Sequence, residues 1–298
     1  MGAMAHSALG APPLIRTACE LVILTALLLI LGLATFAAAI ISKSAQHPVS
    51  AQFRAPLLLL SIAALAAVPL QLLSASAAMA GTGMEQCFAL TPEVLCQTSF
   101  GLAWIVSLPL LMILTAAAWS ISGSRRPVLL IAAIAATLLA VHAAISHAID
   151  FGAVAVISYF IHETAAALWS GALLGLVLVW RGGVLDDASG RLIVVRTSGL
   201  AGWSVAALIA SGLYLAYCAL GLNLDHLLYS AYGRTLIVKV TIFGIAALVG
   251  GYNRYWLVPC AGVPSARSEL MRTVKVELLL ILGVFALAVL LANTPPSH

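Results

Sequence analysis

The chain has 298 residues, of which 63% are hydrophobic and 8% charged, whereas a soluble domain carries about 25% charged residues. This composition excludes an ordinary soluble enzyme, and a mean hydropathy of +1.11 requires long apolar runs of the kind that cross a lipid bilayer. The formal charge of +4 is too small to indicate a nucleic-acid partner and is better explained by loop residues that orient membrane helices.

Apolar runs predict eight membrane-spanning helices in a single domain that takes up the whole chain, residues 1–298. In chain order they cover residues 17–42, 56–80, 100–121, 127–147, 157–180, 199–221, 235–256 and 276–292. Each run is apolar on every face, unlike the alternating strands of a membrane barrel. We therefore predict an all-α, polytopic membrane helix bundle whose outer surface contacts lipid.

The distribution of basic residues predicts the orientation of this bundle. Eleven of the fourteen Lys and Arg residues follow the first, third, fifth and seventh spans. Because basic residues accumulate on the cytoplasmic side, this distribution places both termini outside the cytoplasm, in the periplasm. The first apolar run is longer than the core of a typical signal peptide, so we interpret it as an uncleaved span.

Two cysteines, Cys87 and Cys96, share the predicted external loop of residues 81–99. On this topology the loop faces an oxidising compartment, where a disulfide can persist. We therefore predict a Cys87–Cys96 disulfide. A copper site made of the two thiolates is the alternative, but exposed thiols outside the cytoplasm tend to oxidise.

Ionisable side chains gather near the predicted outer ends of several spans. Such residues are costly in a bilayer and indicate a functional site. The histidines among them suit copper, zinc or iron, so they are the predicted metal ligands: His142, His147 and His162. The remaining members of this group are predicted to support the ligands or to line the access path: Glu20, Glu163, Tyr232 and Lys239.

Helix geometry limits how these histidines can act together. His142 and His147 are five residues apart, which is about 140° around an ideal helix, so we expect only one of them to pair with His162 across a helix interface. On the helix of His162, Gly171 and Gly175 form a pair of small residues that lets a neighbouring backbone approach closely.

Structural roles remain open for the same polar residues. The three histidines can act only as hydrogen-bonding groups between helices, Glu20 can pair with Arg16 at i, i+4, and Lys239 can extend to the membrane interface. A further polar group lies near the predicted inner surface and is expected to brace the last two spans: Asn253, Arg254 and Glu277.

Several spaced motifs resemble the copper resistance protein D family (CopD/PcoD). The resemblance is strongest over residues 140–296, and the first spans resemble the family more loosely. Ser146 stands where the family pattern has glycine, a mild departure. The motifs are Ser146-His147-Ala148, His162, Trp169-Ser170-Gly171, Ser211-Gly212-Leu213-Tyr214, Tyr232-Gly233-Arg234-Thr235-Leu236-Ile237-Val238-Lys239, Gly251-Tyr252-Asn253-Arg254, Pro259, Glu277-Leu278 and Pro295-Pro296.

This resemblance implies a bacterial inner-membrane protein of copper homeostasis that moves copper toward the cytoplasm. It also implies a periplasmic copper carrier of the CopC type as a partner. Because a pair of membrane histidines can also ligate haem, a haem-binding electron-transfer protein is the alternative function. Neither a Walker motif nor a hydrolytic signature is present in the sequence, so we predict a transporter and no enzymatic activity.

Overall fold

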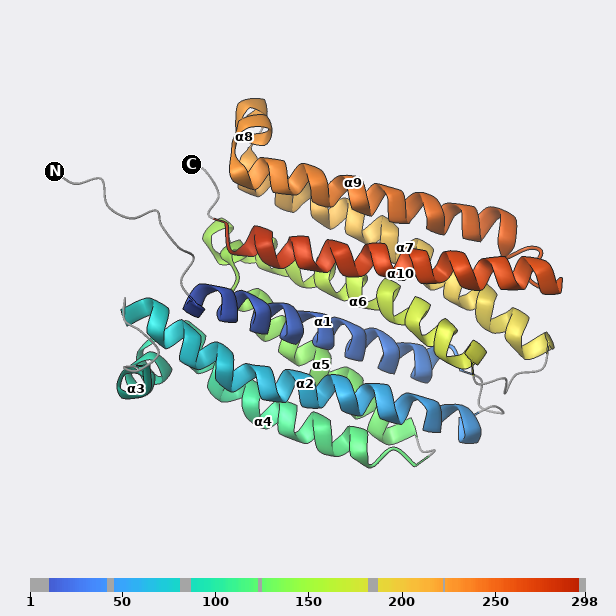
Figure 1. Cartoon of the computed structure of the whole chain (residues 1–298), viewed down its shortest axis with the longest axis horizontal. Coiled ribbons are helices and arrows are strands. Elements are labelled where there is room, and N and C mark those ends of the chain that lie inside the picture. Colours follow the sequence, from blue (N-terminus) through green and yellow to red (C-terminus); the bar gives the residue numbers. More distant parts are fainter. Residues whose placement is uncertain are drawn as a thin grey trace.

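The computed structural model describes residues 11–41, 46–80, 87–122, 125–181, 187–221 and 223–294. Every regular element in these ranges is a helix, which confirms the predicted all-α class (Figure 1). The elements in chain order are α1 (Ala11–Ala39), α2 (Gln46–Ala80), α3 (Cys87–Gln97), α4 (Ser99–Trp119), α5 (Arg125–Ala144), η2 (His147–Phe151), α6 (Ala153–Arg181), α7 (Asp187–Leu220), α8 (Leu224–Tyr229), α9 (Ala231–Tyr252), η3 (Asn253–Leu257) and α10 (Pro264–Ala292).

Within the described ranges, eight helices are long and apolar enough to cross a membrane, as predicted. They are α1, α2, α4, α5, α6, α7, α9 with its continuation η3, and α10. The clearest differences from the predicted spans are the starts of α7 at Asp187 and of α10 at Pro264, where hydropathy had predicted residues 199 and 276. Both helices continue beyond their apolar part into charged turns, which an average of hydropathy leaves out.

Helix α1 lies in the middle of the bundle (Figure 1). It packs against α2, α5, α6 and α10, and it is the most deeply buried of the eight spans, whereas α9 is the least buried. Large apolar side chains such as Leu59, Leu213 and Leu248 are exposed on the surface of the bundle. Such a surface is expected where lipid rather than water surrounds a protein.

Small residues allow α1 and α6 to cross at close range. A Cβ atom added to Gly32 of α1 would lie 2.8 Å from the Cα atom of Gly171 on α6, and one added to Gly175 would lie 2.8 Å from Cε1 of Phe36. Neither space can hold a side chain. The close approach predicted from Gly171 and Gly175 is therefore confirmed, and α1 is the neighbouring helix.

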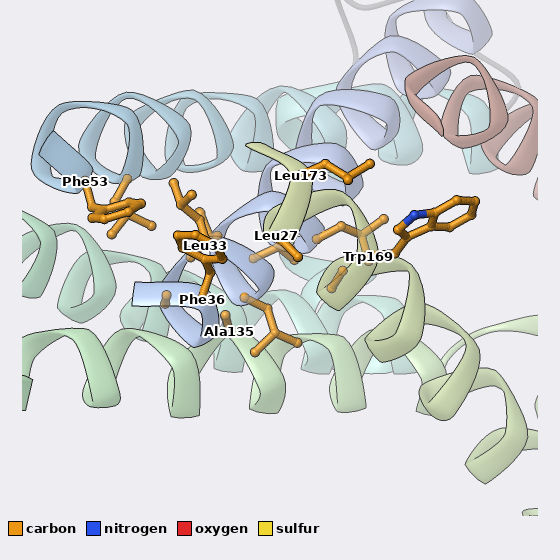
Figure 2. Packing of buried hydrophobic residues seen from close by; sticks show 14 of the residues in the cluster. Leu27, Leu33, Phe36, Phe53, Ala135, Trp169 and Leu173 are labelled. Carbon is orange, nitrogen blue, oxygen red and sulfur yellow. The ribbon is translucent and has the colours of Figure 1, made fainter. Parts of the chain in front are cut away.

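The buried core fills the space between α1, α2, α5 and α6. Phe36 of α1 packs against Phe53 of α2 with ring centroids 5.9 Å apart. Figure 2 shows these rings with Leu33, Ala135 and other core residues. Because lipid tails are as apolar as these side chains, their contribution to stability comes from close van der Waals packing rather than from escape from water.

A tight connection joins α5 to α6 and brings their polar ends together. Ser146 caps the short helix η2, and Gly152 ends it with φ of +89°. This backbone conformation is accessible to glycine and strained for other residues. As a result α6 begins at Ala153 and runs back alongside α5.

The two ends of the bundle differ in charge. We name the end that carries α3 and α8 the outer end, and the opposite end the inner end (Figure 1). The inner end holds most of the described basic residues, including Arg191, Arg196, Arg267, Arg272 and Lys275. These names follow the orientation predicted from that charge distribution.

Candidate metal-binding site

A histidine and a carboxylate meet at the outer end of the bundle. Nδ1 of His142, near the end of α5, lies 2.8 Å from Oε1 of Glu163 on α6. The side chain of Glu163 is 7% exposed and that of His142 is 27% exposed. The predicted role of Glu163 as an acceptor that holds an imidazole therefore corresponds to a contact that the structure contains.

This contact determines which imidazole nitrogen can bind a metal. A carboxylate only accepts hydrogen bonds, so Nδ1 of His142 carries the proton and donates it to Glu163. The lone pair of the neutral ring then lies on Nε2. Many metal-binding histidines use this arrangement, in which a carboxylate fixes the tautomer and raises the basicity of the ligand.

The second oxygen of Glu163 has no hydrogen-bond partner in the described part of the chain, although it is buried. An unpaired buried carboxylate oxygen is costly, because water cannot solvate it. Lys239 of α9 interacts electrostatically with Glu163. Glu163 is therefore placed to accept a further cation beside His142.

Tyr159 of α6 and Glu20 of α1, the latter a predicted supporting residue, lie near this pair. The ring of Tyr159 lies 6.1 Å from that of His142 between centroids. Glu20 of α1 accepts a hydrogen bond of 2.9 Å from Nδ2 of Asn293 on α10. Asn293 is thus the contact that the structure gives Glu20, in place of the Arg16 pairing considered from the sequence.

A cavity of about 80 Å³ adjoins the site between α1, α2, α4 and α5. Glu20 and His142 line it together with Gln71, Trp104 and Ser107. The indole of Trp104 donates a hydrogen bond of 3.1 Å to the carbonyl oxygen of Val68, which fixes this wall of the cavity. His142 therefore borders a space large enough for a small ion or a few water molecules.

His162 lies on α6 directly before Glu163 but contacts α7. Its Nδ1 is 3.0 Å from Oγ of Ser211, and that hydroxyl donates its own proton to the carbonyl oxygen of Ala207 at 2.6 Å. In the tautomer that satisfies both contacts, Nδ1 of His162 donates to Ser211 and Nε2 holds the lone pair. His162 can act as a ligand, but its hydrogen bond connects it to a different helix from that of His142.

His147 lies apart from the other two histidines. It begins η2, its side chain is 65% exposed, and its nearest ionised partner is Asp150 at 3.9 Å. Within the described residues, no three His, Cys, Asp or Glu side chains converge closely enough to hold a metal ion. The predicted site made of His142, His147 and His162 is thus not assembled in this structure. The turn at η2 directs His147 away from the bundle.

The two cysteines of the predicted disulfide lie on one short helix. Cys87 and Cys96 both belong to α3, and nine residues of helix separate their Cα atoms by about 13.5 Å. A disulfide spans at most about 7 Å between Cα atoms. Cys96 is exposed, and the side chain of Cys87 lies outside the described residues. The bond would require α3 to unwind, and it stays a prediction.

A second polar group, at the inner end, is more extensive than the sequence indicated. The indole of Trp169 donates a hydrogen bond of 2.8 Å to Oε1 of Glu277, and Nδ2 of Asn253 donates one of 2.8 Å to Oε2. The predicted brace between the last two spans is therefore present. The sequence analysis did not predict that Trp169 joins this brace. A tryptophan at a similar membrane depth to a buried carboxylate could have indicated it, because a buried indole N–H needs a hydrogen-bond acceptor.

Arg254 was predicted to join this brace but contacts α7 instead. Its guanidinium donates to the carbonyl oxygen of Ser198 on α7 at 2.5 Å. Asn253 and Arg254 are the first two residues of a π-helical turn, Asn253–Leu257. Successive residues of a helix point about 100° apart, so Asn253 faces α10 while Arg254 faces α7.

Two family models and a curated relative match the chain. The family described as "Copper resistance protein D" matches residues 193–291, and the family described as "Copper resistance protein D-like, N-terminal domain" matches residues 11–155. The chain is 28% identical over 252 residues to the copper transport protein CutJ of Bacillus subtilis (strain 168), an alignment that covers 79% of this chain.

The chain spans less than half of the length of this relative, 44%. No solved structure matches the chain. The two family matches follow one another along the sequence, with His142 in the N-terminal match and Glu277 in the C-terminal one, whereas Glu163 and Trp169 lie between the two matches. The chain therefore belongs to the copper resistance protein D family.

Proposed function

We propose that this protein moves copper across the bacterial inner membrane, from the periplasm toward the cytoplasm. The observation that carries the proposal is the buried pair of His142 and Glu163, in which one imidazole nitrogen and one carboxylate oxygen remain available to a cation. The family membership and the copper transport protein among its relatives support copper as the ion. Copper is here the cargo rather than a resident cofactor.

The incomplete ligand set supports transport rather than storage. A transported ion must bind well enough to enter the protein and weakly enough to leave it. One imidazole beside one carboxylate offers fewer ligands than the four of a permanent structural site. We propose His142 as the first ligand and His162 as the next, because His162 directly precedes Glu163 on α6 and also keeps a lone pair on Nε2.

The orientation and the partner are part of the same proposal. The excess of basic residues at the inner end supports placing the His142–Glu163 pair on the periplasmic side. A periplasmic copper carrier of the CopC type would then deliver the ion to the end of the bundle that bears the pair. Tyr232 and Lys239 on α9 would line the access path.

A copper titration of the purified protein tests this assignment. We expect His142→Ala to lose binding to the outer site, measured by competition with a chromophoric copper chelator, while His226→Ala, which removes a histidine of α8 outside the site, retains it. His147→Ala is also expected to retain binding, and a loss there would restore the three-histidine site. A haem absorption band in the protein as purified would favour electron transfer instead.

A further inference from the structure

A second cavity in the described part of the molecule lies away from the outer site, between α6, α7, α9 and α10. It has a volume of about 450 Å³ and is only partly enclosed. Its polar lining includes Thr197, Ser198, Asn253, Arg254 and Glu277. A cavity with this lining can hold water deep in an otherwise apolar bundle.

Glu277 is the most deeply buried ionisable group of this cavity. The residue is 2% exposed, and each of its oxygens accepts one hydrogen bond, from Trp169 and from Asn253. Thr273 donates to Oδ1 of Asn253 at 2.5 Å, which holds the amide with its nitrogen toward the carboxylate. Both partners are thus fixed as donors.

The carboxylate of Glu277 lacks a balancing positive charge. Among the described residues, no Lys, Arg or His side chain forms an ion pair with it. Two hydrogen bonds leave part of the accepting capacity of a carboxylate unused, and an uncompensated charge in a membrane interior is strongly unfavourable. Glu277 therefore needs a cation when it is ionised.

The donor set indicates which cation fits. Copper prefers nitrogen and sulfur ligands, and the cavity lining offers a carboxylate, hydroxyl groups, an amide and backbone atoms of glycines. A guanidinium also lines the cavity and would repel a metal ion. A proton binds directly to a carboxylate oxygen and requires none of the missing ligands.

Arg254 lines the inner side of this cavity. Its guanidinium reaches across to the Ser198 carbonyl oxygen of α7, and a Cβ atom on Gly202 would lie 2.9 Å from its Nη1. Arg254 therefore lies close against the backbone of α7 and links that helix to the π-helical turn η3.

We propose that Glu277 is a proton-binding site, which exchanges a proton with the inner aqueous phase through this cavity during transport. The proposal rests on the proposed transport function for its role and adds the proton as a second transported species. The other ionisable residues that line the cavity are Arg254 and Tyr255, both from η3, and neither α6 nor α7 contributes one to the lining. Glu277 is thus the carboxylate that can carry the exchange.

Infrared spectroscopy of the purified full chain during a pH titration tests the proposal without requiring transport. We expect a C=O stretching band of a protonated carboxylic acid that appears and disappears with pH and is missing in Glu277→Gln. Glu269→Gln is the matched control, because it removes an exposed carboxylate from the inner part of the same helix. It should retain the band.

A titrating band that is the same in Glu277→Gln and in the control would overturn the proposal. If the Gln variant does not fold, Glu277→Asp keeps a carboxyl group, and the band is expected to shift in frequency; an unshifted band would equally contradict the assignment. Copper-driven pH change in proteoliposomes then tests the coupling. Absence of copper uptake by the unaltered protein would refute the transport function, whereas uptake without proton movement would refute only the coupling.

Discussion

At the scale of single residues, the account depends on a carboxylate that is buried beside a histidine. Glu163 holds His142 by a hydrogen bond of 2.8 Å while its second oxygen is unpaired. Removing such a carboxylate that orients a metal-binding histidine typically weakens metal affinity by about 10- to 100-fold. The contribution of Glu163 to copper affinity can therefore be measured by substituting this one residue.

We expect Glu163→Gln to weaken copper binding at the outer site by about 10- to 100-fold. The amide keeps the size of the side chain but loses the charge that attracts the cation and fixes the imidazole. Chelator competition at constant pH measures the affinity. Unchanged affinity in a folded Glu163→Gln protein would show that copper does not use this pair.

Substitution of Lys239 is expected to strengthen copper binding, the opposite of the effect at Glu163. Its charge interacts with Glu163, so in the absence of copper it partly balances the carboxylate, and it competes with an arriving ion. We expect Lys239→Gln to tighten copper binding by about tenfold, equivalent to roughly 1.4 kcal/mol, and to lower the thermal stability of the copper-free protein. Weaker binding in this variant would assign Lys239 a supporting role instead.

The sequence predicted the depth of these residues but not their pairing. Hydropathy places His142 and Glu163 at the outer ends of consecutive spans, because the loop between them is short. The packing of α5 and α6 against α1 determines which of their faces meet. The spacing of residues along one helix cannot predict this. For the same reason the sequence could not show that His147 turns away at η2 or that His162 contacts α7.

At the scale of helices, the crossing of α1 and α6 leaves no room for a side chain larger than glycine at Gly32 or Gly171. A Cβ atom on Gly171 would approach the backbone of Gly32 and Leu33 too closely. Because a backbone cannot rotate away as a side chain does, the two helices would have to separate. Separation would also displace Glu163, which lies on α6 on the outer side of this crossing.

We expect Gly171→Ala to destabilise the protein by about 1–3 kcal/mol, the usual cost of overpacking. Thermal unfolding in detergent measures the change. Gly283→Ala on α10 is the control, because a Cβ atom there has no neighbour within 4 Å, and alanine is the better helix former. Equal stability of the two variants would contradict the close crossing.

The sequence predicted the membrane-spanning helices but not the shorter helical elements. Long apolar runs located all eight spans, since length and hydropathy suffice for that. The short helix α3 was missed, because its eleven residues are only moderately apolar and include Pro92. The π-helical turn Asn253–Leu257 was also missed, because nothing in local composition distinguishes it from an ordinary helix.

At the scale of the whole molecule, two exposed cysteines lie near opposite ends of the bundle and test its orientation. Cys96 is on α3 at the outer end, and Cys260 follows η3 at the inner end. The distribution of basic residues predicts that Cys96 faces the periplasm. A membrane-impermeant maleimide added to intact spheroplasts should therefore label Cys96, whereas Cys260 should react only after permeabilisation.

Peptide mapping of the labelled protein distinguishes the two cysteines. Labelling of Cys260 before Cys96 would reverse the predicted orientation. The same experiment examines the predicted disulfide, because a Cys87–Cys96 bond would make labelling of Cys96 depend on prior reduction. Labelling without a reductant would show that Cys96 is a free thiol, as its exposed position on a continuous helix suggests.

The most direct test of the central claim is copper accumulation by cells or proteoliposomes that contain the protein. The unaltered protein and His226→Ala should raise internal copper, and His142→Ala and Glu163→Gln should abolish most of this rise at equal protein levels. Accumulation that is independent of His142 and Glu163, or a failure of the unaltered protein to accumulate copper, would contradict the account.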